Sequence, residues 1–104
     1  MRTHSYFVYI LTNAARKVLY TGVTNNLCRR LEEHKTDSKG AKKSFAGTYN
    51  CFYLVYWEHF QYIDQAIARE KEIKGWRRAK KEALIGVFNP QWKFLNDEVG
   101  CSFD

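Results

Sequence analysis

The sequence predicts an α+β fold, a small three-stranded antiparallel sheet flanked by helices, with elements in the order β-β-α-β-α-α. Two short stretches rich in tyrosine and aliphatic residues lie close together with a polar turn between them, and a third such stretch covers 51–59. The other long segments carry apolar residues at helical spacing. At 104 residues the chain has the size of one domain, which we place at 1–96, and we expect an unstructured tail at 97–104.

The first two predicted strands, 6–12 and 17–22, form a hairpin around the polar turn 13–16. If that turn closes the hairpin directly, Tyr9 and Tyr20 face each other on one side of the sheet. With Gly22 leaving bare backbone beside them, the two phenols would form a place for a substrate. The alternative is that both tyrosines only pack a half-buried sheet, since tyrosine is common in strands.

A first helix is predicted after residues 24–26, which supply a capping residue, and it should end near residue 35. The spacing rule places four side chains on its inner face: Leu27, Arg30, Leu31 and His34. An arginine there either extends along the apolar surface to water or points at a bound anion. Residues 36–50 read as a polar, basic loop.

A second helix is predicted over 64–74, with Asp64 as its N-cap and Gly75 at its end. Its apolar arc consists of Ile63, Ala66, Ile67, Glu70 and Ile73. A carboxylate in such an arc is costly to bury unless it is paired or binds a metal. Glu70 therefore either forms an ion pair, with Arg30 or a nearby lysine, or is the single carboxylate ligand of a hard cation such as Mg²⁺.

A third helix is predicted over 77–85, ended by Gly86 and by Asn89-Pro90. Taken alone, Asn89 before a proline reads as a residue that starts a turn.

The composition favours an anionic partner. The net charge is +6, with 17 Lys+Arg against 11 Asp+Glu, which is typical of proteins that bind nucleic acid or a lipid surface. The basic residues gather in two places: Lys39, Lys42 and Lys43 in the loop, and Arg77, Arg78, Lys80 and Lys81 in the third helix. The alternative for the second cluster is a solvated helix face.

The cysteines and the hydropathy exclude other classes. Cys28, Cys51 and Cys101 are odd in number and scattered, without zinc spacing, so we expect neither a disulfide framework nor a structural metal. No apolar run approaches the length of a membrane span. We therefore expect a cytoplasmic protein.

From about residue 6 to 92 the chain resembles the GIY-YIG endonuclease superfamily in its compact, single-domain form. It is similar to the N-terminal nuclease domain of the incision subunit of bacterial nucleotide excision repair, and to the catalytic domain of certain intron-encoded homing endonucleases. Val8-Tyr9-Ile10 stands where the family has Gly-Ile-Tyr, and Tyr20-Thr21-Gly22 where it has Tyr-Ile-Gly. The other matches are the family arginine at Arg30, a supporting His or Tyr at His34, the metal-binding glutamate at Glu70 and the asparagine that closes the site at Asn89.

The chain departs from the family in two places. The first motif shares only Tyr9, and Val23 follows Gly22 where the repair-subunit relatives carry a lysine. Whatever phosphate contact that lysine provides is absent here or comes from another residue.

The resemblance implies metal-assisted hydrolysis of DNA phosphodiester bonds with one Mg²⁺ or Mn²⁺ ion, and a place in DNA repair or recombination with a repair protein as a possible partner. In that scheme Glu70 holds the ion and Arg30 neutralises charge on the phosphate. Tyr20 acts as the general base, and Tyr9 positions the water or accepts its proton. The remaining roles are phosphate orientation or proton relay by His34, a phosphate or metal-water contact by Asn89, and DNA backbone binding at Gly22, Lys39, Lys42, Lys43, Arg77 and Arg78.

Two other readings stay open. The chain could be a non-catalytic nucleic-acid-binding module with the same fold, or a protein-interaction domain of a repair assembly. The ordered set of tyrosine, arginine and glutamate favours the enzyme.

Overall fold

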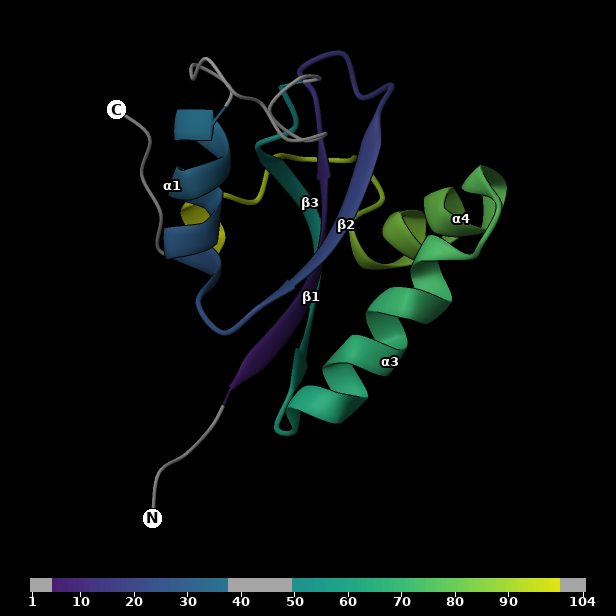
Figure 1. Cartoon of the computed structure of the whole chain (residues 1–104). Helices are drawn as coiled ribbons and strands as arrows, with labels where there is room; N and C mark the ends of the chain where they lie inside the picture. The colour runs from purple at the N-terminus through teal and green to yellow at the C-terminus, as the bar shows by residue number, and fades with distance from the viewer. Residues whose placement is uncertain (1–4, 38–49, 100–104) are drawn as a thin grey trace.

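The computed structural model describes residues 5–37 and 50–99, and it confirms the α+β fold with the order β-β-α-β-α-α. Strands β1 (Tyr6–Thr12), β2 (Leu19–Thr24) and β3 (Tyr53–Phe60) form an antiparallel sheet in the order β2-β1-β3. Helix α1 (Leu27–Asp37) lies on one face of the sheet, and α3 (Ile63–Lys74) and α4 (Arg78–Phe88) lie on the other (Figure 1).

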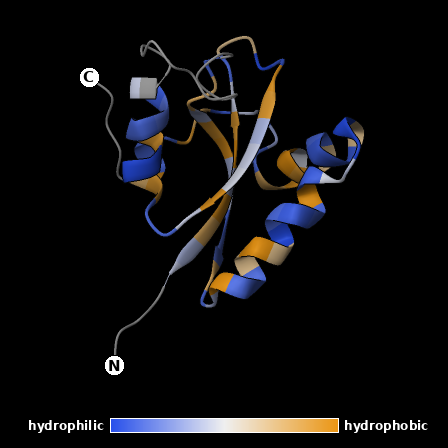
Figure 2. Cartoon of the chain, viewed as in Figure 1, coloured by the Kyte–Doolittle hydropathy of each residue, from blue (hydrophilic) through white to orange (hydrophobic). Residues whose placement is uncertain are grey.

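The alternation of side chains along β1 produces two apolar layers. Tyr9 and Leu11 point to one side, where they pack with Leu27 and Leu31 of α1. On the other side, a second layer is formed by Val8, Ile10, Val55, Tyr56, Ala66, Ile73 and Ile85. Apolar residues are concentrated in the strands, whereas the visible surface of α1 is mostly hydrophilic (Figure 2). The sheet therefore separates two cores, and α1 and α3 approach it from opposite sides.

The register of the hairpin differs from the prediction. Tyr9 pairs with Gly22 and Leu11 with Tyr20, so the direct Tyr9–Tyr20 pairing is wrong. The expected turn is present, since the Arg16 N–H donates to the Asn13 carbonyl at 2.9 Å, but the loop continues for two more residues. Asn13 Oδ1 accepts from the backbone N–H of Lys17 at 2.9 Å and of Val18 at 3.3 Å. Because the shift is two residues, both tyrosines stay on the same face of the sheet.

The helices follow the predicted plan with shifted ends. Helix α1 runs to Asp37, and α3 begins at Ile63, one residue before the expected cap. Helix α4 continues through Gly86 to Phe88, so that glycine does not end it. A single glycine costs a helix about 1 kcal/mol relative to alanine, which the packing of α4 can offset. A short 3-10 helix, Asp97–Val99, occupies the first part of the segment expected to be unstructured.

Two buried asparagines attach the segment after α4 to strand β3. Val55 has no partner in the β1–β3 register, and its carbonyl accepts from Asn89 Nδ2 at 3.1 Å. The same Nδ2 donates to the Lys93 carbonyl at 2.8 Å, and the Lys93 N–H donates to Asn89 Oδ1 at 3.0 Å. Asn96 accepts from the Leu54 N–H and donates to the Phe52 carbonyl, both at 2.9 Å. The amide of Asn89 thus closes a bulge in β3.

The cysteines differ from one another. Cys28 is disulfide-bonded, a bond that the sequence did not predict. Cys51 is a buried thiol, and burial raises its pKa to about 11. Within 5–37 and 50–99, no three His, Cys, Asp or Glu side chains are grouped to hold a metal ion. None of the helices in these ranges is long and apolar enough to cross a membrane.

Candidate active site

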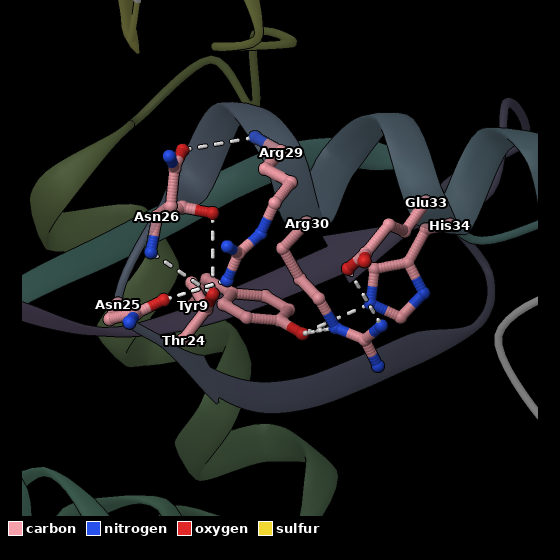
Figure 3. A network of polar contacts seen from close by, with 8 residues as sticks. All are labelled: Tyr9, Thr24, Asn25, Asn26, Arg29, Arg30, Glu33 and His34. Atoms are coloured by element: carbon pink, nitrogen blue, oxygen red, sulfur yellow. Dashed lines mark hydrogen bonds and ion pairs between the residues drawn. The ribbon is translucent and has the colours of Figure 1, made fainter.

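Two predicted site residues, Arg30 and His34, contact the hydroxyl group of a third, Tyr9. Tyr9 is 1% exposed on β1, and its oxygen lies 3.0 Å from His34 Nε2 and 3.3 Å from Arg30 Nε (Figure 3). Arg30 and His34 come from successive turns of α1, as their spacing predicted. Two polar side chains from the inner face of α1, Arg30 and His34, therefore contact one buried phenol.

The chemistry of the donors determines how these hydrogen bonds run. Arg30 Nε can only donate, so the Tyr9 oxygen accepts. The Tyr9 proton is then available to Nε2 of a neutral His34, whereas a charged His34 would itself donate to the Tyr9 oxygen. In both states the phenol connects the imidazole to the guanidinium.

Tyr20 completes an aromatic trio. Its ring centroid lies 5.2 Å from that of His34 and 6.4 Å from that of Tyr9, and the His34 ring is edge-on to both tyrosines. Tyr20 is half-buried, whereas Tyr9 is fully buried. The register shift thus keeps the two tyrosines adjacent, and Tyr20 is the one with access to solvent.

Arg30 is held at two points and remains accessible. Besides the bond to Tyr9, its Nη1 forms an ion pair with Glu33 Oε1 at 3.3 Å, and 38% of its side chain is exposed. Burial by itself lowers the pKa of Arg30, but the hydrogen bond and charge interaction with Tyr9, together with Glu33 and Tyr20, raise it overall. The guanidinium is therefore charged, oriented and open to an anion.

The start of α1 is fixed by the predicted capping residues. Asn26 Oδ1 accepts from the Arg29 N–H at 3.0 Å, which is an N-cap bond, and Thr24 Oγ1 accepts from the Asn26 N–H at 3.1 Å (Figure 3). Arg29 Nη2 also donates to Asn25 Oδ1 at 2.8 Å. These bonds fix the first turn of α1, from which the side chain of Arg30 extends.

Gly22 allows Tyr9 to lie flat over β2. A Cβ atom at Gly22 would lie 2.4 Å from the Tyr9 Oη and 2.5 Å from its Cζ. The backbone of Gly22 is buried under this ring, so it is not the bare surface for substrate that the sequence suggested.

We expect Gly22→Ala to destabilise the protein by about 1–3 kcal/mol, because the new methyl group must displace the Tyr9 ring. Urea unfolding measures the loss. The cost should shrink in a Tyr9→Ala background, where the conflict is absent. Gly86→Ala is the matched control, since a Cβ there meets nothing within 4 Å and should be neutral or stabilising. Equal costs at both glycines would contradict this account.

Tyr9 is a poor proton acceptor at neutral pH. Its pKa is raised to about 12, chiefly because burial disfavours the charged phenolate; the hydrogen bond and charge of Arg30 lower the pKa, and the charges of Tyr20 and Glu70 raise it. The proposed role of Tyr9 as a group that accepts a proton from water is therefore disfavoured, and its positioning role is favoured.

The raised pKa also predicts how stability depends on pH. The unfolded phenol ionises near 10 and the folded one near 12, so this contribution is complete below pH 10 and is lost as the pH rises from 10 to 12. Two pKa units correspond to about 2.7 kcal/mol at most. In Tyr9→Phe this loss should disappear, which unfolding curves across that range would measure. An identical slope in both proteins would contradict the prediction, since Tyr56, whose pKa is also raised to about 12, is common to both.

Glu70 lies on α3 with 17% of its side chain exposed, and Lys74 Nζ approaches its Oε2 at 3.6 Å. Its charge acts on the Tyr9 phenol, so the carboxylate is within electrostatic reach of the trio although α3 covers the other side of the sheet. Within 5–37 and 50–99 Glu70 belongs to no group of three His, Cys, Asp or Glu side chains, and a lone, partly covered carboxylate suits an ion that keeps most of its waters, such as Mg²⁺.

The residues predicted to contact DNA differ in the contacts that they make within the protein. Arg78 donates to the backbone carbonyls of Lys17 and, at 3.3 Å, of Arg16, and its Nε donates to Glu82 at 3.3 Å. It therefore fastens α4 to the β1–β2 loop. Arg77 is exposed at the N-cap of α4 and remains available to a ligand. Lys39, Lys42 and Lys43 lie outside the described residues.

Asn89 is not brought to the phenol cluster by the contacts of its side chain, which go to the backbone of Val55 and Lys93. The expected contact with a phosphate or metal-bound water has no support in this geometry. The sequence did not identify Asn96, whose side-chain amide also bonds to the backbone at β3. The signal was weak, because an asparagine near the end of a chain is ordinary.

The comparisons with known proteins agree with the resemblance. The family model described as the GIY-YIG catalytic domain matches residues 5–83. A UPF0213 protein of Natronomonas pharaonis is 42% identical over 80 residues, covering 77% of this chain and 89% of the relative. One from Desulfotalea psychrophila is 36% identical over 81 residues, covering 78% and 71%. The solution NMR structure of a UPF0213 protein from Bacillus halodurans superposes with a TM-score of 0.55 at 28% identity, covering 94% of this chain and 99% of that one. The chain belongs to the GIY-YIG family.

Proposed function

We propose that the chain is a metal-dependent endonuclease that hydrolyses phosphodiester bonds in DNA with one Mg²⁺ or Mn²⁺ ion, and that it acts in DNA repair or recombination in the cytoplasm. Family membership supports nuclease chemistry. The observation that carries the proposal is the convergence of Arg30 and His34 on the buried Tyr9 hydroxyl, with Tyr20 against the same rings. Packing alone would not require a charged and a titratable group at that point.

The roles of the tyrosines follow from their burial. Tyr20, half-buried at the edge of the trio, is the general base that removes a proton from the attacking water. Tyr9 stays protonated, because burial raises its pKa, and it holds Arg30 and His34 in place. Through Tyr9, His34 orients the guanidinium and can exchange a proton with the phenol.

Arg30 binds the phosphate. With Nε fixed by Tyr9 and Nη1 by Glu33, the plane of its guanidinium is set before substrate arrives. A preorganised cation of this kind stabilises the charge that develops on the phosphate oxygens. Glu70 would hold the divalent ion, which supplies Lewis-acid stabilisation of the phosphate and the leaving group.

The positive charge of the chain supports a nucleic acid as the substrate. The net charge of +6, with Arg77 exposed at the start of α4, provides contacts to the DNA backbone without base readout. The contacts of Arg78 with the β1–β2 loop support a structural role for that arginine.

A cleavage panel tests the proposal. The purified protein is incubated with duplex, single-stranded, flap, branched and mismatched DNA, and with RNA, in Mg²⁺, Mn²⁺ or EDTA. We expect cleavage of at least one DNA form with metal and none with EDTA. Salt-sensitive binding without cleavage of any substrate would favour the non-catalytic module instead. A protein partner that is captured from lysate equally well with and without nuclease treatment would favour an interaction domain.

A further inference from the structure

Lys74 forms an ion pair with Glu70, the carboxylate that binds the metal ion in the proposed function. Its Nζ lies 3.6 Å from Glu70 Oε2, one helical turn further along α3. Lys74 is 51% exposed and Glu70 only 17%, so the lysine reaches a largely covered carboxylate from the solvent side. One carboxylate thus has two candidate cations, the lysine of this chain and a divalent ion.

Lys74 lies on α3, which covers the face of the sheet opposite α1 and contacts β2, the strand that carries Tyr20 and Gly22. Ile73, the residue before it, is fully buried in the apolar layer against which Val23 of β2 packs. Val23 follows Gly22 directly, and it is apolar, so β2 itself offers no cation at that point. Lys74 is a positive side chain paired with Glu70, a group whose charge acts on the pKa of Tyr9.

We propose that Lys74 is a second functional cation of this site, which neutralises Glu70 in the metal-free protein and contacts the DNA phosphate once a divalent ion occupies Glu70. This proposal rests on the proposed function. An ion pair between residues four apart on a helix surface is weak, so a divalent ion displaces the ammonium. The ammonium is then repelled by the ion. Its flexible four-carbon stem and three donors suit a phosphate oxygen.

The proposal makes opposite predictions for metal and for DNA. Removal of the competing charge in Lys74→Met should tighten the binding of Mn²⁺ to the DNA-free protein by about 3- to 10-fold. The same variant should lose about 10-fold in kcat/KM for DNA cleavage at saturating Mn²⁺, because a phosphate contact is missing. A lysine that serves only as a surface ion pair with Glu70 would leave kcat/KM at saturating Mn²⁺ unchanged.

Electron paramagnetic resonance of Mn²⁺ titrated into the protein, with cleavage assayed on the same preparations, tests both halves. The matched control is Lys71→Met, which removes the same charge from an exposed position on α3 that faces another direction. Glu70→Gln shows which part of the Mn²⁺ signal belongs to Glu70.

Tighter Mn²⁺ binding with weaker cleavage in Lys74→Met, and little change in Lys71→Met, supports the proposal. Unchanged Mn²⁺ affinity, unchanged cleavage, or equal effects of the two lysine variants overturns it. If the wild type shows no Glu70-dependent Mn²⁺ binding, the proposed function itself fails. Glu70-dependent binding that Lys74→Met leaves unchanged overturns only the role of Lys74.

Discussion

Glu70→Gln is expected to reduce metal-dependent cleavage by about 10³-fold or more, because a neutral amide loses the charge that holds a divalent ion, and Lewis-acid stabilisation contributes several kcal/mol. The fold should survive, since glutamine has the same shape and the ion pair with Lys74 is a partly exposed pair within one helix. Single-turnover cleavage at saturating protein measures the rate, and circular dichroism checks the fold.

Glu72→Gln provides the control for this change. Glu72 lies two residues further along α3, is 54% exposed and pairs with Arg69. Its replacement should leave cleavage near the wild-type rate. Equal losses in the two variants would mean that general negative charge on α3, and not a metal site at Glu70, supports the activity.

Tyr20→Phe is the second large effect that we expect, a loss of about 10²- to 10⁴-fold in the single-turnover rate, which is the range for removal of a general base. The ring remains, so its packing against Tyr9 and His34 is kept and stability should change little. Because the missing group acts in the chemical step, the loss should appear in kcat and less in KM.

The control is Tyr53→Phe, which removes a hydroxyl from another half-buried strand tyrosine, one that stacks on Phe94 with centroids 4.2 Å apart. It should cleave at the wild-type rate. A Tyr20→Phe protein with normal kcat would assign the base to another group, and the buried Tyr9 would be a poor substitute because of its raised pKa.

The fold was predictable because it depends on local patterns. Alternation along 6–12 identified β1 to the residue, and helical spacing placed Leu27, Leu31 and His34 on the buried face of α1. The hairpin register was not predictable, since it depends on Asn13 bonding to the N–H groups of Lys17 and Val18. The prediction that Tyr9 and Tyr20 lie on the same face of the sheet was still correct, because the register differs from the predicted one by two residues, an even number.

Site residues whose position depends on helix spacing or on a motif were predictable from the sequence. The contacts of residues that bond to backbone groups far away in the sequence were not predictable. Arg30 and His34 share one face of α1, as their spacing predicted, and from that face they contact Tyr9. Asn89 and Arg78 look in sequence like a site residue and a DNA contact, but their partners are carbonyls 34 and 61 residues away along the chain. Such partners are fixed by tertiary packing, which the spacing of residues does not report.

The central claim is that Tyr20, Arg30 and Glu70 form one metal-dependent hydrolytic site. The most direct test titrates Mn²⁺ into the wild type and into Glu70→Gln, and records site occupancy and single-turnover DNA cleavage on the same samples. We predict that the cleavage rate of the wild type rises in parallel with occupancy, and that Glu70→Gln loses both. Cleavage in EDTA, or cleavage by Glu70→Gln at the wild-type rate, would contradict the claim.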